Sequence, residues 1–224
     1  MRVVMRVVMS AAAVTLLTAA PLLAQSERGY VTGLGGFAVS PETKSGDAAA
    51  EAGVRIAPHL LLFGDLGQFH NLQPSDAQPA VDATTALLSN GESLSVLGTP
   101  RVPAWYGVGG LRYEVPTHSR VSPYVLGGIG FARLTPTAQF TYASGTLPDG
   151  STAAVGDDVT TQLVTAGDFT APPAATARMF TVGGGVDIPV ARHWAVDVGY
   201  RSSRVSADTP LTAHGATFGF GYRF

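Results

Sequence analysis

Alternating apolar and polar positions mark much of this chain as β-strands. The clearest case is the segment LTAHGATFGFGYRF, residues 211–224, in which one face carries four aromatic side chains, Phe218, Phe220, Tyr222 and Phe224. Because successive strand side chains point to opposite faces, small or polar residues occupy the other face. Four large aromatics would crowd the interior of a narrow barrel, whereas on the outside they can contact lipid.

The same pattern recurs along the chain. In WAVDVGYRSS, residues 194–203, one face has aromatic ends and an aliphatic middle, as is typical of the girdles around a membrane-spanning apolar band. Comparable segments cover residues 29–39, 50–56, 60–69, 105–115, 123–134 and 180–188. The total is about eight strands, and an even number lets an antiparallel barrel close.

The connections between these strands differ in length in a regular way. Short links near Pro58, Pro116 and Pro189 alternate with the segments 40–49, 71–103, 135–175 and 205–210, two of which are long. Outer-membrane barrels have short periplasmic turns and longer external loops. We therefore predict an all-β fold, an eight-stranded antiparallel transmembrane up-and-down β-barrel, with the long connections outside.

The first 24 residues have the pattern of a signal peptide. Arg2 and Arg6 precede an apolar run from Val7 to Ala20, and Ala24 offers a small residue for cleavage. The run is short for a spanning helix of about 20 residues, which disfavours the alternative of an uncleaved anchor. We predict a signal peptide over 1–24 and a barrel domain over 25–224. No later apolar run is long enough for a helix to cross a membrane, so a membrane role requires strands.

The composition supports a surface that does not face water. Charged residues make up 13% of the chain, against about 25% in ordinary soluble domains. There is no cysteine, which excludes disulfides, cysteine-ligated zinc and cysteine nucleophiles. Lys44 is the only lysine and no basic stripe with interleaved aromatics occurs, so we expect no nucleic-acid partner.

Charged residues fall on the faces opposite the lipid-facing ones. A buried charge is costly unless it is paired and hydrogen-bonded, and an eight-stranded barrel is just wide enough for side chains to fill it. We therefore predict a lumen plugged by ion pairs; the alternative is that some of these charges lie at strand ends in water. The predicted interior charges are Glu51, Arg55, Asp65, Arg112, Glu114, Asp187, Asp197, Arg201 and Arg223.

The chain resembles the small outer-membrane β-barrel family, the OmpA-like or opacity-type porin-family proteins. The resemblance covers residues 29–224 and is carried by FGFGYRF at the end of the chain, the glycine–aromatic strands and PYVLGGIGFAR. It implies a location in the outer membrane of a Gram-negative-type bacterium, in contact with outer-membrane lipids. The terminal aromatics Phe218, Phe220, Tyr222 and Phe224 resemble the insertion signal read by the barrel-assembly machinery. Since the last strand reaches Phe224, we expect no cell-wall-binding domain after it.

Candidate catalytic chemistry is sparse. Ser203, Asp208 and His214 could in principle meet as a triad, but nothing local resembles an activated nucleophile, and the His-x-Ser signature of lipid-deacylating barrels does not occur. No two histidines stand at metal-ligand spacing. We predict no catalytic residue, no cofactor and no metal. Three histidines in or beside the short turns fit a polar rim: His59, His118 and His193.

The long connections, residues 71–103 and 135–175, leave two interpretations open. Their Ala, Thr, Pro and Asp content is typical of mobile, hydrated surface loops. Alternatively, they form a surface that contacts an extracellular ligand or a host. Three aromatics, Phe140, Tyr142 and Phe169, could extend strands above the membrane or anchor such a contact.

The leading hypothesis is a non-enzymatic integral outer-membrane β-barrel with a structural or surface-interaction role. Three alternatives remain at this point. They are a narrow channel for small solutes, a lipid-modifying barrel enzyme, and a soluble periplasmic or secreted barrel that binds a small ligand.

Overall fold

The computed structural model describes residues 28–40 and 43–224. The predicted signal peptide, residues 1–24, lies outside the described residues. Within the described part of the chain, no helix is both long enough and apolar enough to cross a membrane.

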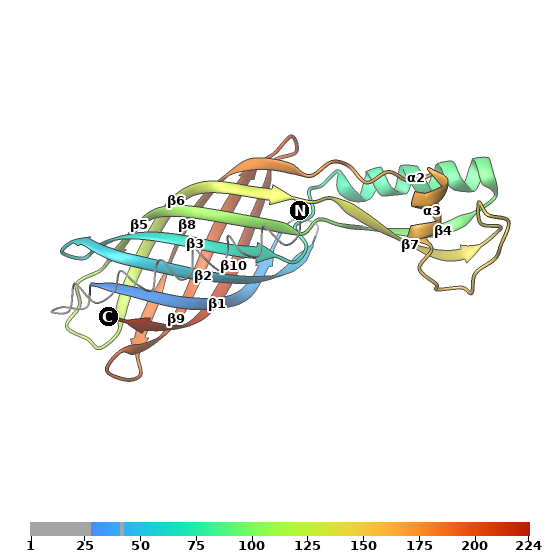
Figure 1. Ribbon diagram of the computed structural model, residues 1–224. Coiled ribbons are helices and arrows are strands. Elements are labelled where there is room, and N and C mark those ends of the chain that lie inside the picture. The colour runs from blue at the N-terminus through green and yellow to red at the C-terminus, as the bar shows by residue number, and fades with distance from the viewer. Residues whose placement is uncertain (1–27, 41–42) are drawn as a thin grey trace, which may run out of the picture.

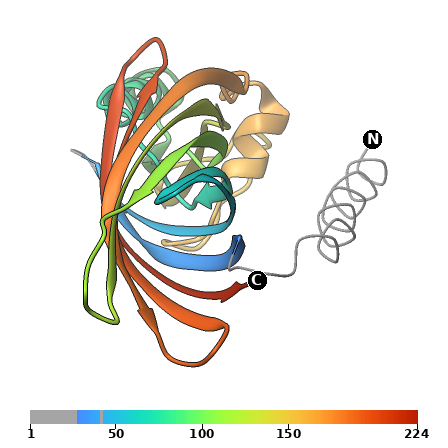
Figure 2. The same cartoon turned by 90° about the vertical axis from the view of Figure 1, so that its left-hand side faces the viewer.

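Eight strands close into one antiparallel barrel (Figures 1 and 2). Their order around the barrel is β1-β10-β9-β8-β6-β5-β3-β2. The first and last strands close the ring, with the Gly29 N–H donating to the Phe224 carbonyl and the Phe224 N–H to the Gly29 carbonyl, both at 3.0 Å. The predicted eight-stranded up-and-down barrel is confirmed. The strands are β1 (Gly29–Val39), β2 (Lys44–Ala57), β3 (Leu60–Phe69), β5 (Ala104–Glu114), β6 (Ser122–Leu134), β8 (Ala175–Pro189), β9 (Trp194–Ser206) and β10 (Leu211–Arg223).

The outer wall of the barrel is apolar. In β9, Trp194 and Tyr200 point outward and are 43% and 55% exposed, whereas Asp197 and Arg201 are buried. The ring of Trp194 stacks on that of Phe220 in the neighbouring strand, with centroids 4.9 Å apart. An exposed apolar belt of this kind matches a lipid-facing surface rather than a surface in water.

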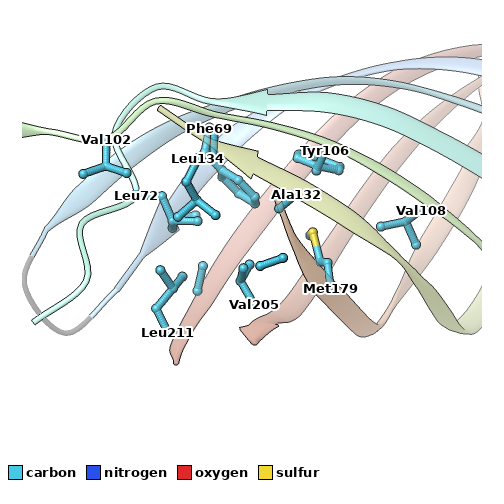
Figure 3. Close-up of a cluster of buried hydrophobic side chains, with 14 of the residues drawn as sticks. Phe69, Leu72, Val102, Tyr106, Val108, Ala132, Leu134, Met179, Val205 and Leu211 are labelled. Carbon is cyan, nitrogen blue, oxygen red and sulfur yellow. The ribbon is translucent and has the colours of Figure 1, made fainter. Parts of the chain in front are cut away.

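The interior of the barrel near the long connections is also apolar (Figure 3). Leu72 lies just after β3 and Val102 just before β5, and both close over the mouth, with 0% and 2% exposure. The sequence analysis assigned small and polar residues to the inner faces of the clearest strands, but it did not predict this apolar cluster. Inward positions near the strand ends pack against the connecting segments and so join a dry core. The cluster includes Phe69, Leu72, Val102, Ala132, Leu134, Met179, Val205 and Leu211.

The two long connections contain regular structure that the sequence analysis did not predict. The first holds α2 (Ala77–Glu92) and β4 (Ser95–Arg101), and the second holds β7 (Thr137–Ser144) and α3 (Thr160–Ala166). Figure 1 shows these four elements extending beyond one end of the barrel.

Strands β4 and β7 continue the β5–β6 pairing out of the barrel. Ala104 faces Leu134, and three residues further out Arg101 faces Thr137, so the two ladders share one register. Prolines at 103 and 136 interrupt the ladder because they lack an N–H group. The Thr135 N–H bridges the gap by donating to the Pro103 carbonyl at 3.0 Å.

These outer elements have a hydrophobic core of their own, and we call residues 74–101 and 137–169 the external subdomain. Phe140 is 0% exposed, and its ring packs edge-on against that of Phe169 with centroids 4.9 Å apart. Phe140 and Tyr142 lie in β7, which extends beyond the end of the barrel. The interpretation of both segments as mobile, hydrated surface loops did not anticipate these regular elements and their core. The core comprises Val81, Leu88, Leu94, Val96, Ala138, Phe140, Tyr142, Leu147, Val159 and Leu163.

Candidate functional site

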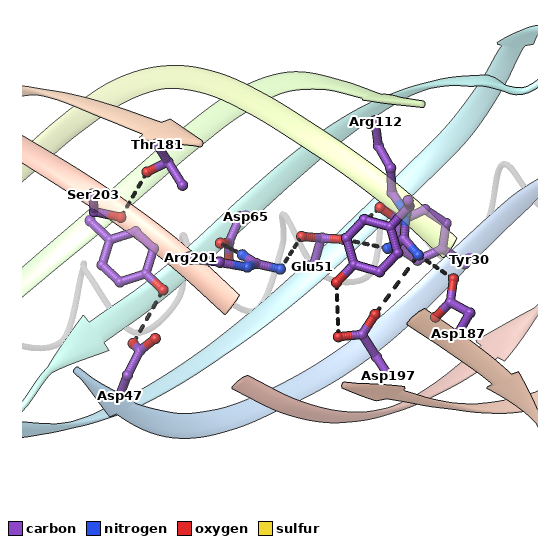
Figure 4. A network of polar contacts seen from close by, with 12 residues as sticks. Tyr30, Asp47, Glu51, Asp65, Arg112, Thr181, Asp187, Asp197, Arg201 and Ser203 are labelled. Carbon is purple, nitrogen blue, oxygen red and sulfur yellow. Dashed lines mark hydrogen bonds and ion pairs between the residues drawn. The ribbon is translucent and has the colours of Figure 1, made fainter. Parts of the chain in front are cut away.

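A layer of charged side chains crosses the middle of the barrel (Figure 4). Its centre is Glu51 on β2, which is 1% exposed. Arg112 approaches one carboxylate oxygen at 3.2 Å and Arg201 approaches the other at 2.6 Å. The Tyr30 hydroxyl donates a hydrogen bond of 2.5 Å to the oxygen that Arg112 also contacts. Both oxygens of this buried carboxylate are therefore satisfied by cations or donors, as a buried charge requires.

One ion pair of the layer joins opposite walls. Arg201 on β9 donates to Asp65 on β3 at 2.5 Å. In the strand order, β9 and β3 are separated by three strands in either direction, so they face each other across the lumen. The Arg201 side chain therefore spans the interior rather than lying along one wall.

Arg112 interacts with the remaining acidic side chains of this layer. It forms an ion pair with Asp187, and its Nη2 lies 3.8 Å from an Asp197 oxygen. Its guanidinium lies over the ring of Tyr124, 3.5 Å from the ring centroid, where the negative face of the ring attracts a cation. Arg223 approaches Asp187 at 2.7 Å, so two guanidiniums share that carboxylate.

Two of the nine predicted interior charges lie apart from this layer. Arg55 and Glu114 pair with each other at 2.6 Å, with side chains 31% and 16% exposed. They line a small cavity toward the end with the short turns. The other seven predicted interior charges lie together, and we call them the charged layer. They are Glu51, Asp65, Arg112, Asp187, Asp197, Arg201 and Arg223.

Sequence reasoning missed the tyrosines that support this layer. Each of three interior tyrosines lies directly opposite a glycine on the next strand, and a Cβ atom on that glycine would collide with the tyrosine side chain. The missing side chain lets the ring lie across its neighbour and reach inward. An interior tyrosine directly opposite a glycine therefore marks a ring that reaches into the barrel. This pairing can be recognised only once the register between the two strands is known. The pairs are Tyr30–Gly53, Tyr106–Gly67 and Tyr124–Gly185.

The tyrosine hydroxyls satisfy acids that have fewer arginine contacts. Tyr124 donates to Asp197 at 3.1 Å, and Tyr106 donates to Asp47 at 3.2 Å. Asp47 is a further inward-facing acid that the sequence analysis did not single out. It lies four residues before Glu51 in β2, and simple alternation places it on the same face.

The charged layer and the apolar cluster lie in series along the barrel axis. A small cavity on one side of the layer is lined by Asp65, Arg201, Phe69 and Met179 among others. The cavity on the other side includes Asp187 and Arg223.

The structure does not assemble the catalytic triad weighed from the sequence. The Ser203 hydroxyl lies inside the barrel, 3.0 Å from that of Thr181. His214 is exposed on the outer wall, where its ring stacks on Tyr200. The serine and the histidine therefore lie on opposite sides of the wall. Among the described residues, no group of three or more His, Cys, Asp or Glu side chains could hold a metal ion.

The fold, the lipid-facing belt and the filled interior together define a small transmembrane β-barrel protein. The family model of the outer membrane protein beta-barrel domain matches residues 9–224, and the chain belongs to this family. It is an outer-membrane protein of a Gram-negative-type bacterium. The alternative of a soluble ligand-binding barrel is therefore set aside.

Solved structures of barrel proteins are similar to this chain at low sequence identity, and one of them has a TM-score above 0.5. Neisserial surface protein A has a TM-score of 0.53 and 16% identity, over 89% of this chain and 98% of that chain. The N-terminal β-barrel domain of Pseudomonas aeruginosa OprF has a TM-score of 0.48 and 10% identity, over 88% and 98% of the two chains. Ail of Yersinia pestis has a TM-score of 0.46 and 13% identity, over 89% and 100%. A comparison with curated proteins found no match.

Proposed function

We propose that this protein is a non-enzymatic outer-membrane barrel with a closed lumen, and that it presents the external subdomain at the cell surface to contact an extracellular molecule. The barrel anchors the external subdomain in the membrane. Outer-membrane lipids surround it, and the aromatic run that ends at Phe224 is the signal read by the barrel-assembly machinery.

The packing inside the barrel supports a closed lumen. The charged layer joins opposite walls through Arg201 and Asp65, and the apolar cluster fills the mouth beyond it. Charged and apolar barriers in series disfavour the alternative of a narrow solute channel, because a conducting path needs continuous polar lining.

The observation that carries the surface role is the folded external subdomain. A structured unit with its own core holds its outer residues in fixed positions, which a mobile loop does not. Four large apolar side chains on it stand in solvent: Leu87, Leu97, Val155 and Val164 are 73%, 68%, 80% and 49% exposed. Scattered exposed apolar residues are common on protein surfaces, so the fixed shape of the subdomain is what favours an interaction surface.

Cysteine labelling on intact cells tests this arrangement. The chain has no cysteine, so a single introduced thiol is an unambiguous reporter. We expect Leu97→Cys, in the external subdomain, to react with a membrane-impermeant maleimide on intact cells. We expect His118→Cys, in an exposed turn at the opposite end, to react only after the cells are opened, because short turns face the periplasm.

The matched pair makes the result decisive. Both positions are solvent-exposed, so a difference in labelling reports the side of the membrane rather than burial. Labelling of His118→Cys alone on intact cells would reverse the orientation and remove the proposed surface role. Absence of labelling at both positions until lysis would place the subdomain away from the cell surface and also reject the proposal.

A further inference from the structure

The outer wall of the barrel carries a cluster of cations on adjacent strands. In the described barrel strands, every aspartate and glutamate points inward, whereas four basic residues point outward: Lys44, Arg133, Arg178 and Arg204. The three arginines are exposed on the adjacent strands β6, β8 and β9. Outward-facing charge on a lipid-facing wall is costly at the bilayer centre and tolerated near the interface.

Strand register brings these arginines close together. Arg178 faces Phe131 on β6, two residues from Arg133, and it faces Ser206 on β9, two residues from Arg204. Such diagonal neighbours on one face of a sheet have Cβ atoms about 7–8 Å apart. Their long side chains can therefore converge on one anionic group from three strands.

Aromatic residues fix the height of this arginine cluster in the membrane. Trp105 lies directly opposite Arg133 across the β5–β6 ladder and is 55% exposed on the outer wall. Within their own strands, Phe131 and Phe180 lie two residues closer to the middle of the barrel than Arg133 and Arg178, and they directly face Arg178 and Arg204 on the neighbouring strands. Both phenylalanines are exposed. Tryptophan and other aromatics gather at the membrane–water interface, so the arginines lie at the level of the lipid headgroups. This end of the barrel also carries the external subdomain, so in the orientation of the proposed function, on which this inference rests, it faces the outer leaflet.

We propose that Arg133, Arg178 and Arg204 form a binding site for the phosphate groups of an outer-leaflet lipid. Arginine suits this role because its planar guanidinium remains charged and donates paired hydrogen bonds to phosphate oxygens. The occupant is a lipid rather than a soluble anion, because the cluster lies on the wall that faces the membrane and is continuous with the apolar belt. The acyl chains would lie along the exposed Phe131 and Phe180 while the phosphates contact the arginines.

Lipid retention measured by native mass spectrometry tests the proposal. The folded protein in a zwitterionic detergent is titrated with bis-phosphorylated lipid A, and the bound fraction is compared with that of the triple variant Arg133→Gln/Arg178→Gln/Arg204→Gln. Each basic residue near an anionic surface contributes enough attraction that losing three should weaken binding by about tenfold or more. The charge-matched control Arg101→Gln/Arg120→Gln/Arg192→Gln removes three exposed arginines elsewhere and should bind like the wild type.

Two further measurements identify the source of the bound anion and control for misfolding of the triple variant. Lipid A stripped of its phosphates should bind the wild type as weakly as the triple variant binds intact lipid A, and inorganic phosphate should not displace the lipid. If the triple variant does not fold, as judged by its gel mobility without boiling, Arg178→Gln alone should weaken binding about fivefold. Equal binding by wild type and cluster variants, equal loss in the charge-matched control, or displacement by inorganic phosphate would each overturn the proposal.

Discussion

Replacing Arg201 by methionine is expected to lower the free energy of unfolding by about 3–5 kcal/mol. The substitution keeps much of the side-chain volume but removes the guanidinium that contacts Glu51 at 2.6 Å and Asp65 at 2.5 Å. Both carboxylates are buried, with 1% and 3% exposure. Without Arg201, Asp65 loses the one ion pair that it forms within the described part of the chain, and an unpaired buried charge is far more costly than a lost surface pair.

Urea unfolding in detergent micelles, followed by tryptophan fluorescence, measures this loss. The control Arg192→Met lies in the exposed turn before β9 and should change stability by no more than about 0.5 kcal/mol. A loss for Arg201→Met that is no greater than that of the control would show that the charged layer contributes little to stability.

Replacing Phe140 by alanine is expected to destabilise the external subdomain by about 3–5 kcal/mol while leaving the barrel folded. Phe140 is fully buried and packs against Phe169, and its removal leaves a cavity in a core of only about ten side chains. The barrel has a separate core and a continuous ladder around its wall, so it does not depend on this ring.

Limited proteolysis distinguishes loss of structure in the external subdomain from loss of structure in the barrel. We expect the Phe140→Ala variant to be cut within residues 74–101 or 137–169 at protease concentrations that spare the wild type, while the barrel retains its shifted gel mobility without boiling. Leu97→Ala is the control, because this side chain is 68% exposed on the same subdomain and should leave proteolysis unchanged. Equal resistance of the Phe140→Ala variant and the wild type would show that the subdomain does not depend on its core.

The barrel could be predicted from the sequence because its signal is local. A strand between lipid and a filled lumen must alternate, and residues 194–203 and 211–224 do so clearly. The same alternation placed Glu51, Asp65 and Arg201 on inner faces. It did not give their partners, since Arg201 and Asp65 meet only because closure places β9 opposite β3. Partner choice therefore depends on strand order and stagger, which local patterning does not contain.

The external subdomain was missed because its stability comes from tertiary contacts. The Ala- and Thr-rich segment of α2 has little intrinsic tendency to form a helix apart from its alanines, and Pro79 suggests that a helix would be broken there. Pro79 nevertheless lies in the first turn, where its missing N–H costs no helical hydrogen bond. Val81 and Leu88 are buried in the subdomain core, and a Cβ on Gly98 of β4 would collide with Val81. This close helix–strand contact is a tertiary contact, which local patterning does not contain.

Conductance across a planar lipid bilayer tests most directly the central claim that the lumen is closed. The wild-type protein, inserted at single-molecule density beside a known porin as a positive control, should add no discrete current steps above the bare-membrane leak. That result follows if the Arg201–Asp65 ion pair and the apolar cluster hold the interior shut. Stable, voltage-independent steps that recur with each insertion of the purified protein would contradict the account and make the barrel a channel.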